Sequence, residues 1–172
     1  GDFNWYFALT RDGKPLVDPY NIFSYTFATM AFAQLHKATG EERYAEATRR
    51  TFQHILERWD NPKAQWSKAH AGSRDMRAMA PSMILCNLLL EIEHLMDPAV
   101  VEESIDKALG DVMNTFYRPE LGLVVEHINA DGTLSDTFDG RLINPGHTLE
   151  TMWFVMDLAR RRGDKALIEK AV

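Results

Sequence analysis

A histidine and a glutamate stand three residues apart in the segment Asn144-Pro145-Gly146-His147-Thr148-Leu149-Glu150. A proline and a glycine directly before a periodic apolar run are typical of a helix start, so His147 is predicted to lie in the first turn of a helix. Residues three apart share one helical face, which places Glu150 beside His147. An imidazole exchanges a proton near neutral pH, and a nearby carboxylate stabilises its charged form. The two side chains could therefore transfer protons. Equally, His147 could cap the helix and Glu150 could close a capping box.

The hydrophobic periodicity predicts three pairs of helices that would position this segment. The first helix of each pair, over residues 22–38, 79–96 and 148–161, is apolar or small on nearly all sides. The second, over residues 42–58, 100–116 and the stretch after Asp164, is amphipathic. A helix that is apolar all round must be covered on all sides, whereas an amphipathic helix has one face in water. We therefore expect two concentric layers, and a repeat of more than 50 residues favours an α/α toroid over shorter helical repeats.

The links between the helices differ in length. Those within a pair are short, whereas those between pairs span residues 59–78 and 117–144, so the long links should gather at one end of the array. Loops on a rigid scaffold are where binding residues concentrate. The second long link is predicted to hold a β-hairpin, with strands over residues 123–128 and 133–134 around the turn 129–132. A similar small hairpin is expected over residues 5–13.

Composition excludes several classes of function. The 172 residues carry a net charge of −6, with 25 acidic against 19 basic residues and no dense basic run, so nucleic-acid binding is not expected. No apolar stretch reaches the roughly 18 residues of a membrane span. The single cysteine, Cys86, cannot form an internal disulfide, which favours a cytoplasmic location. The chain lacks an initiator methionine and stops inside a helical pattern, so we expect residues 1–172 to form part of one domain, cut at both ends.

A longer motif surrounds the histidine. Gly140-Arg141, the segment 144–147, Glu150 and Trp153-Phe154 together closely resemble the signature of the N-acylglucosamine 2-epimerase family. That family includes the renin-binding protein, cellobiose and mannose 2-epimerases, and isomerases acting on mannose or sulfoquinovose. Weaker similarity extends over most of the chain. The resemblance implies an all-α, (α/α)6-barrel fold, of which three helix pairs would form about half the ring.

The resemblance also implies a mechanism. In the family, the sugar ring opens, a base removes the C2 proton, and an enediolate forms. Reprotonation at C2 gives the epimer, and protonation at C1 gives the ketose. His147 matches the first of two family histidines, and the second is expected beyond Val172. Glu150 matches the acidic partner, and Arg141 is placed to donate to sugar hydroxyls. No metal or cofactor is expected, because the carbonyl already acidifies the C–H bond.

Four further side chains are candidate substrate contacts, each with a structural alternative. Glu126 lies in the link expected to overhang the pocket. Arg77 precedes the second apolar helix and could instead pair with a carboxylate. Tyr25, on the first apolar helix, could instead be a core residue. Trp153 could stack on a sugar or pack between helices.

Two departures from the family pattern bear on the substrate. Enzymes acting on disaccharides carry a histidine where Met83 stands, which argues against the cellobiose branch. The N-acetylglucosamine enzymes carry an arginine where Phe27 stands, which weakens an N-acyl substrate.

Three functions therefore remain open. The leading one is an epimerase or isomerase that binds a small sugar, with a homodimer as a candidate assembly. The second is a glycoside hydrolase on the same toroid, although no dominant carboxylate pair stands out in the long links. The third is a non-catalytic helical scaffold.

Overall fold

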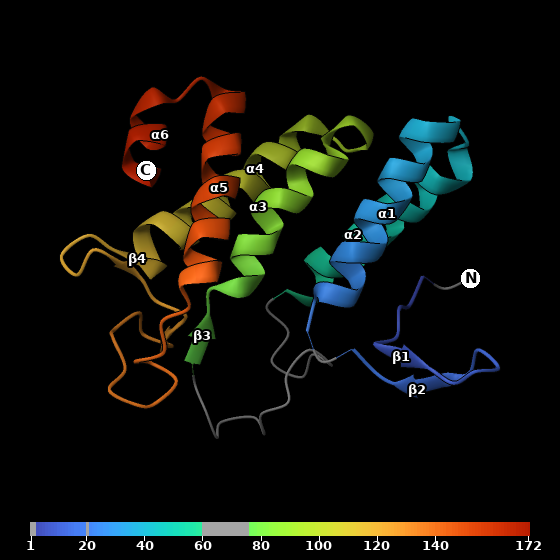
Figure 1. Cartoon of the computed structure of the whole chain (residues 1–172). Helices are drawn as coiled ribbons and strands as arrows, with labels where there is room; N and C mark the ends of the chain where they lie inside the picture. Colours follow the sequence, from blue (N-terminus) through green and yellow to red (C-terminus); the bar gives the residue numbers. More distant parts are fainter. Residues whose placement is uncertain (1–2, 20, 60–75) are drawn as a thin grey trace. The chain divides into compact units, whose positions relative to one another are not determined.

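A computed structural model describes residues 3–19, 21–59 and 76–172 of the chain (Figure 1). Most of the first predicted long link therefore lies outside the described residues. The chain divides into two compact units. One comprises Gly1–Arg74 with Glu91–Asp97, and the other Asp75–Leu90 with Pro98–Val172.

The first unit contains a hairpin and a pair of helices. Strand β1 (Ala8–Leu9) pairs antiparallel with β2 (Pro15–Val17), which confirms the predicted N-terminal hairpin. Helix α1 (Phe23–Thr39) ends at Gly40, which has a left-handed φ of 70° that glycine adopts without strain. The chain then reverses into α2 (Glu42–Arg58), which lies beside α1 (Figure 1). The bounds of both helices agree with the sequence prediction to within one or two residues.

The remaining helices follow in two successive pairs. The predicted helix over residues 79–96 is α3 (Ala80–Ile92) followed by a 3₁₀ turn, η1 (Glu93–Leu95). The predicted helix over 100–116 is α4 (Pro98–Gly110), which widens into a π-helix, η2 (Asp111–Phe116). Helix α5 (Pro145–Arg162) packs against α6 (Lys165–Ala171), whose first turn is capped by the side chain of Asp164. None of the helices in the described ranges is long and apolar enough to cross a bilayer.

The strands of the second unit pair differently from the sequence prediction. Strand β4 (Tyr117–Arg118) pairs with β5 (Leu123–Val124), and β3 (Met76–Ala78) pairs with β6 (His127–Asn129), both antiparallel. The turn from Asn129 to Gly132 forms as expected, and the Asn129 N–H donates to the Thr133 carbonyl across it (3.0 Å). The prediction that residues 133–134 form a strand is wrong. Alternating apolar residues identify a strand but not the strand with which it pairs. Strand β3, some 50 residues earlier in the chain, is the partner of β6.

The three apolar helices are not equally covered. Along α3, Met83, Ile84, Leu85, Cys86, Leu88 and Leu89 are all buried, as predicted. By contrast, Phe27 on α1 and Leu149 and Trp153 on α5 are exposed by 59%, 74% and 57%. The prediction that every apolar helix is buried all round is therefore wrong for α1 and α5 in this structure. Sequence composition shows which faces are apolar, but it does not show which element covers them.

A cluster of ion pairs ties α5 to α4. Glu102 accepts hydrogen bonds from Arg161 and Arg162 at 2.6 Å each, and Arg162 also contacts Asp106 at 2.7 Å. The hydrogen bond from Arg161, followed in size of effect by the one from Arg162, holds the pKa of the Glu102 carboxyl below its ordinary value. A carboxyl whose pKa is lower in the folded than in the unfolded state stabilises the fold above its ordinary pKa, and this stabilisation is lost as the pH falls through the folded pKa.

Replacing Glu102 by Gln should therefore weaken the acid dependence of stability. We expect the free energy of unfolding of the full-length protein to fall less steeply between pH 5 and pH 3 in Glu102→Gln than in the wild type, as measured by urea titration at each pH. Glu103→Gln is the matched control, because Glu103 is exposed and forms no ion pair with a described residue. Equal pH dependence in Glu102→Gln and the wild type would contradict this account.

Candidate active site

The start of α5 fixes the position of His147. Asn144 is the N-cap, and its side-chain oxygen accepts hydrogen bonds from the backbone N–H groups of Gly146 (3.1 Å) and His147 (3.3 Å). Pro145 occupies the first helical position, where its missing N–H leaves no hydrogen bond unmade. His147 is therefore in the first turn, as predicted. The alternative that His147 itself caps the helix is wrong, because Asn144 does so.

The carboxylate beside His147 belongs to Glu126. This residue lies between β5 and β6, and its backbone carbonyl accepts a hydrogen bond from the N–H of Met79 (2.9 Å), which extends the β3–β6 ladder by one residue. The side chain is only 7% exposed. Both carboxylate oxygens lie within reach of Nδ1 of His147, at 3.1 Å for Oε1 and 3.0 Å for Oε2.

This contact determines which ring nitrogen of His147 carries a proton. An ionised carboxylate can only accept hydrogen bonds, so the Nδ1 atom must be the donor. In the neutral ring, Nε2 then holds the lone pair. No described residue hydrogen bonds to Nε2, and the side chain is 39% exposed, so a bound ligand can reach it. A buried carboxylate that orients an imidazole and leaves its far nitrogen accessible has the geometry of a general base.

Glu150 does not fill the role predicted from its spacing. It is half-buried and forms no hydrogen bond or ion pair with any described residue. The carboxylate expected one turn along the helix is instead supplied from a loop 21 residues earlier. Helical spacing could place Glu150 near His147, but it could not show that the Nδ1 side of the ring faces the β5–β6 link.

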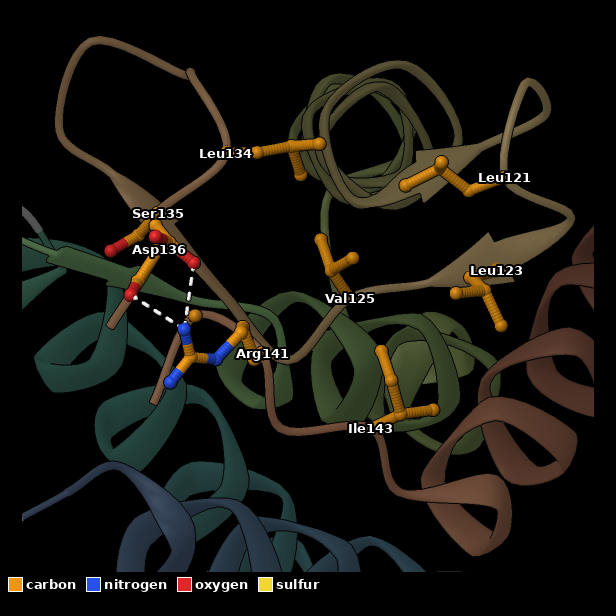
Figure 2. A pocket seen from close by; sticks show the side chains of 9 residues that line it. Leu121, Leu123, Val125, Leu134, Ser135, Asp136, Arg141 and Ile143 are labelled. Atoms are coloured by element: carbon orange, nitrogen blue, oxygen red, sulfur yellow. Dashed lines mark hydrogen bonds and ion pairs between the residues drawn. The ribbon is translucent and has the colours of Figure 1, made fainter. Parts of the chain in front are cut away.

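Arg141 lines a pocket of its own in the second unit (Figure 2). The pocket has a volume of about 350 Å³, and its wall is mainly aliphatic; Leu121, Leu123, Val125, Leu134 and Ile143 contribute to it. The guanidinium of Arg141 pairs with Asp136 at 2.7 Å, and both side chains are largely exposed. Neither His147 nor Glu126 is among the described residues that line this pocket.

Close packing against Ser135 explains why a glycine stands at position 140. A Cβ atom on Gly140 would overlap the backbone carbonyl of Ser135. Only glycine therefore allows the chain to pass so close to Ser135 and present Arg141 at the rim of the pocket.

Arg77 has a protein partner. Its guanidinium donates to Asp111 Oδ1 at 2.7 Å, and Ser82 donates to the other oxygen of Asp111 at 2.9 Å. The guanidinium also lies 5.9 Å from the centre of the Phe116 ring. These contacts fasten β3 and the start of α3 to the π-helix, which favours the structural alternative for Arg77.

The two aromatic candidates have different environments. Tyr25, in the first unit, is buried, and its hydroxyl donates to Asn4 (3.1 Å) and accepts from Arg58 (2.7 Å). These contacts favour a core role for Tyr25. Trp153 is more than half exposed, with its ring centre 5.2 Å from that of the buried Phe154. An exposed indole on the helix that carries His147 keeps the sugar-stacking interpretation open. Among the described residues, no group of three or more His, Cys, Asp or Glu side chains could hold a metal ion.

Comparison with known proteins agrees with the motif around this histidine. The family described as N-acylglucosamine 2-epimerase (GlcNAc 2-epimerase) matches residues 1–172. The chain belongs to this family. It is 35% identical over 170 residues to the N-acylglucosamine 2-epimerase of Rattus norvegicus and 33% identical over 169 residues to that of Homo sapiens. It is also 28% identical over 173 residues to the mannose-6-phosphate isomerase of Rhizobium meliloti (strain 1021).

These relatives are longer than the chain. It covers 39% of the rat protein, 38% of the human protein and 44% of the Rhizobium protein, whereas 94%, 94% and 97% of the chain itself is matched. The chain therefore spans about two-fifths of the length of its curated relatives.

Solved structures confirm the predicted fold class. A sugar epimerase from a ruminal bacterium matches with a TM-score of 0.73 and 17% identity, over 93% of this chain and 43% of that one. Cellobiose 2-epimerase from Bacillus thermoamylovorans B4167 matches with a TM-score of 0.67 and 12% identity, over 86% and 42%. D-mannose isomerase matches with a TM-score of 0.65 and 12% identity, over 98% and 42%. These neighbours support an all-α, (α/α)6-barrel fold, of which this family member spans less than half.

Proposed function

We propose that the whole protein is a carbohydrate 2-epimerase in which His147 transfers the C2 proton of an open-chain sugar and Glu126 orients its ring. The observation that carries this proposal is the contact between Nδ1 of His147 and both oxygens of the buried Glu126 carboxylate, at 3.0 and 3.1 Å. Membership of the N-acylglucosamine 2-epimerase family supports the choice of reaction.

The geometry suits removal of a proton from carbon. Nε2 of His147 accepts the C2 proton, and the ring becomes an imidazolium with a hydrogen on each nitrogen. The Glu126 carboxylate then stabilises that positive charge through a charge-assisted hydrogen bond from Nδ1. The electron pair left by the proton moves toward the C1 carbonyl and forms an enediolate. Return of a proton to the other face of C2 gives the epimer.

Inversion at C2 needs a second acid on the opposite face of the enediolate. Following the family resemblance, we expect a histidine in the part of the relatives' length that this chain does not cover. Glu150, Arg141 and Trp153 are proposed to contact the sugar from the same unit as His147. A cytoplasmic location, which the single cysteine supports, and a homodimer complete the proposal.

The substrate class is an aldose or an N-acylhexosamine. Relatives named N-acylglucosamine 2-epimerase favour the second, whereas Phe27, at the position where the N-acetylglucosamine enzymes are expected to carry an arginine, favours the first. An aldose–ketose isomerase is the second candidate, because both the Rhizobium relative and one structural neighbour are named as isomerases. The two reactions share the enediolate and differ only in whether C2 or C1 receives the proton.

Incubation of the full-length protein with single sugars in D₂O tests the proposal. The panel comprises N-acetylglucosamine, N-acetylmannosamine, glucose and mannose, and proton and carbon NMR follow each sugar. We expect deuterium at C2 of at least one of them, with an epimer as product. A ketose product would select the isomerase, and the absence of exchange with every sugar would refute both.

A further inference from the structure

Two buried residues connect the backbones that carry Glu126 and His147. Met79 is the last residue before α3 and is completely buried. Its N–H donates to the carbonyl of Glu126 (2.9 Å), and its sulfur lies 3.3 Å from the hydroxyl oxygen of Thr151. Met79 therefore contacts the loop that supplies the carboxylate and the helix that supplies the imidazole.

Thr151 completes the connection. It lies one turn after His147 on α5, is completely buried, and donates its hydroxyl to the backbone carbonyl of His147 at 2.6 Å. The four contacts therefore form a closed circuit. The Glu126 carboxylate contacts the His147 imidazole, and the His147 carbonyl accepts from the Thr151 hydroxyl. The Thr151 hydroxyl lies against the Met79 sulfur, and the Met79 amide donates to the Glu126 carbonyl. A closed circuit of contacts fixes the distance between the Glu126 carboxylate and the His147 imidazole more tightly than the β5–β6 link or helix α5 could alone.

We propose that Thr151 and Met79 are positioning residues that hold Glu126 and His147 at the separation needed for proton transfer. The inference rests on the proposed function, because it assigns these residues a task in the same reaction. Catalytic groups must be held to about 0.5 Å, and a misplacement of about 1 Å can lower the rate on the order of 100-fold. A strand that slips by one residue turns its side chains to the opposite face, so the Met79–Glu126 hydrogen bond also keeps the Glu126 carboxylate on the side of His147.

An ordinary packing role is the competing explanation. Threonine hydroxyls in helices commonly bond to the carbonyl four residues earlier, and Thr48 does so with Tyr44 at 2.8 Å. Thr48 is also completely buried, but it lies on α2 in the first unit and has no hydrogen bond to Glu126, His147 or Met79. It therefore provides a matched control for loss of a buried, back-bonded hydroxyl.

The experiment compares Thr151→Val, Met79→Leu and Thr48→Val in the full-length protein. Valine keeps the shape of threonine without the hydroxyl, and leucine fills the space of methionine without the sulfur. Steady-state kinetics give kcat and KM for the sugar selected above, and ¹⁵N NMR of labelled histidine reports which ring nitrogen of His147 carries hydrogen.

For Thr151→Val we expect kcat to fall about 10- to 100-fold with little change in KM, and the ¹⁵N signals of His147 to show a mixture of tautomers instead of one. Met79→Leu should change both quantities in the same direction by a smaller factor, and Thr48→Val should change neither.

Wild-type kcat and a single tautomer in both Thr151→Val and Met79→Leu would overturn the inference, and so would an equal loss of kcat in Thr48→Val. If Thr151→Val does not fold, Met79→Leu decides. If the wild type exchanges no sugar proton, the proposed function fails on its own, and the tautomer measurement still decides whether these residues position the ring.

Discussion

Replacement of His147 by Asn in the full-length protein is expected to lower the rate of C2 hydrogen exchange by about 10²- to 10⁴-fold, the range that general acid–base groups contribute. Asparagine can place its amide NH₂ near the position of Nδ1, facing Glu126, but it has no group at the position of Nε2 and cannot take up a proton. The N-cap is unaffected, because Asn144 bonds to the backbone N–H groups of Gly146 and His147 and not to the imidazole. Exchange is measured by NMR in D₂O, with circular dichroism as the check that helicity is retained.

His54 supplies the control for this variant. It also faces a carboxylate, with Nδ1 lying 3.5 Å from Glu57, but the pair is on α2 in the first unit, and Glu57 is more than half exposed. His54→Asn should exchange at the wild-type rate. If His147→Asn also retained the wild-type rate, the role assigned to His147 would be wrong.

Replacement of Glu126 by Gln is expected to have the second largest effect. The amide keeps the size of the carboxylate but removes the charge that stabilises an imidazolium. If its NH₂ group turns toward Nδ1, the ring must shift its hydrogen to Nε2 and can no longer accept a proton there. A wrong tautomer of this kind can lower kcat by up to about 10⁴-fold, and we expect a loss on the order of 10²- to 10⁴-fold with a smaller change in KM.

Two further substitutions sharpen this prediction. Glu57→Gln removes the exposed carboxylate beside His54 and should leave kcat unchanged. Glu150→Gln tests the carboxylate that helical spacing predicted beside His147. Glu126→Gln tests the carboxylate that contacts the imidazole in the structure. Glu150→Gln should raise KM more than it lowers kcat if Glu150 contacts the sugar. A larger loss of kcat in Glu150→Gln than in Glu126→Gln would reverse the assignment of the orienting carboxylate.

Local sequence signals predicted much of the fold. Helix bounds followed from periodic apolar residues and from helix-breaking or capping residues such as Gly40, Pro145-Gly146 and Asp164, because capping depends on residues within one turn of a helix end. The same signals placed His147 in the first turn of α5. The π-helix at the end of α4 was not predicted, since its apolar residues Val112, Met113 and Phe116 keep the spacing of an ordinary helix. The widening coincides with the contacts of Asp111 to Arg77 and Ser82.

Long-range contacts decided the rest of the site. Glu126 was a candidate, but its contact with His147 depends on the pairing of β6 with β3, more than 45 residues away in the chain. The structural alternatives for Arg77 and Tyr25 are favoured for a similar reason. Asp111 lies 34 residues from Arg77, and Arg58 lies 33 residues from Tyr25, so no local pattern could show that these polar groups already have partners.

The amino-acid sequence alone therefore determined the helix pairs, the family and the histidine that we propose as the base. These features depend on near neighbours along the chain or on a motif contained in 15 residues, 140–154. Only the tertiary structure decided which carboxylate meets that histidine and which nitrogen of the ring is left for a substrate. Both depend on which strands pair and where the loops lie. The free-energy difference between alternative strand partners comes from packing against residues far away in the chain, which no short stretch of sequence specifies.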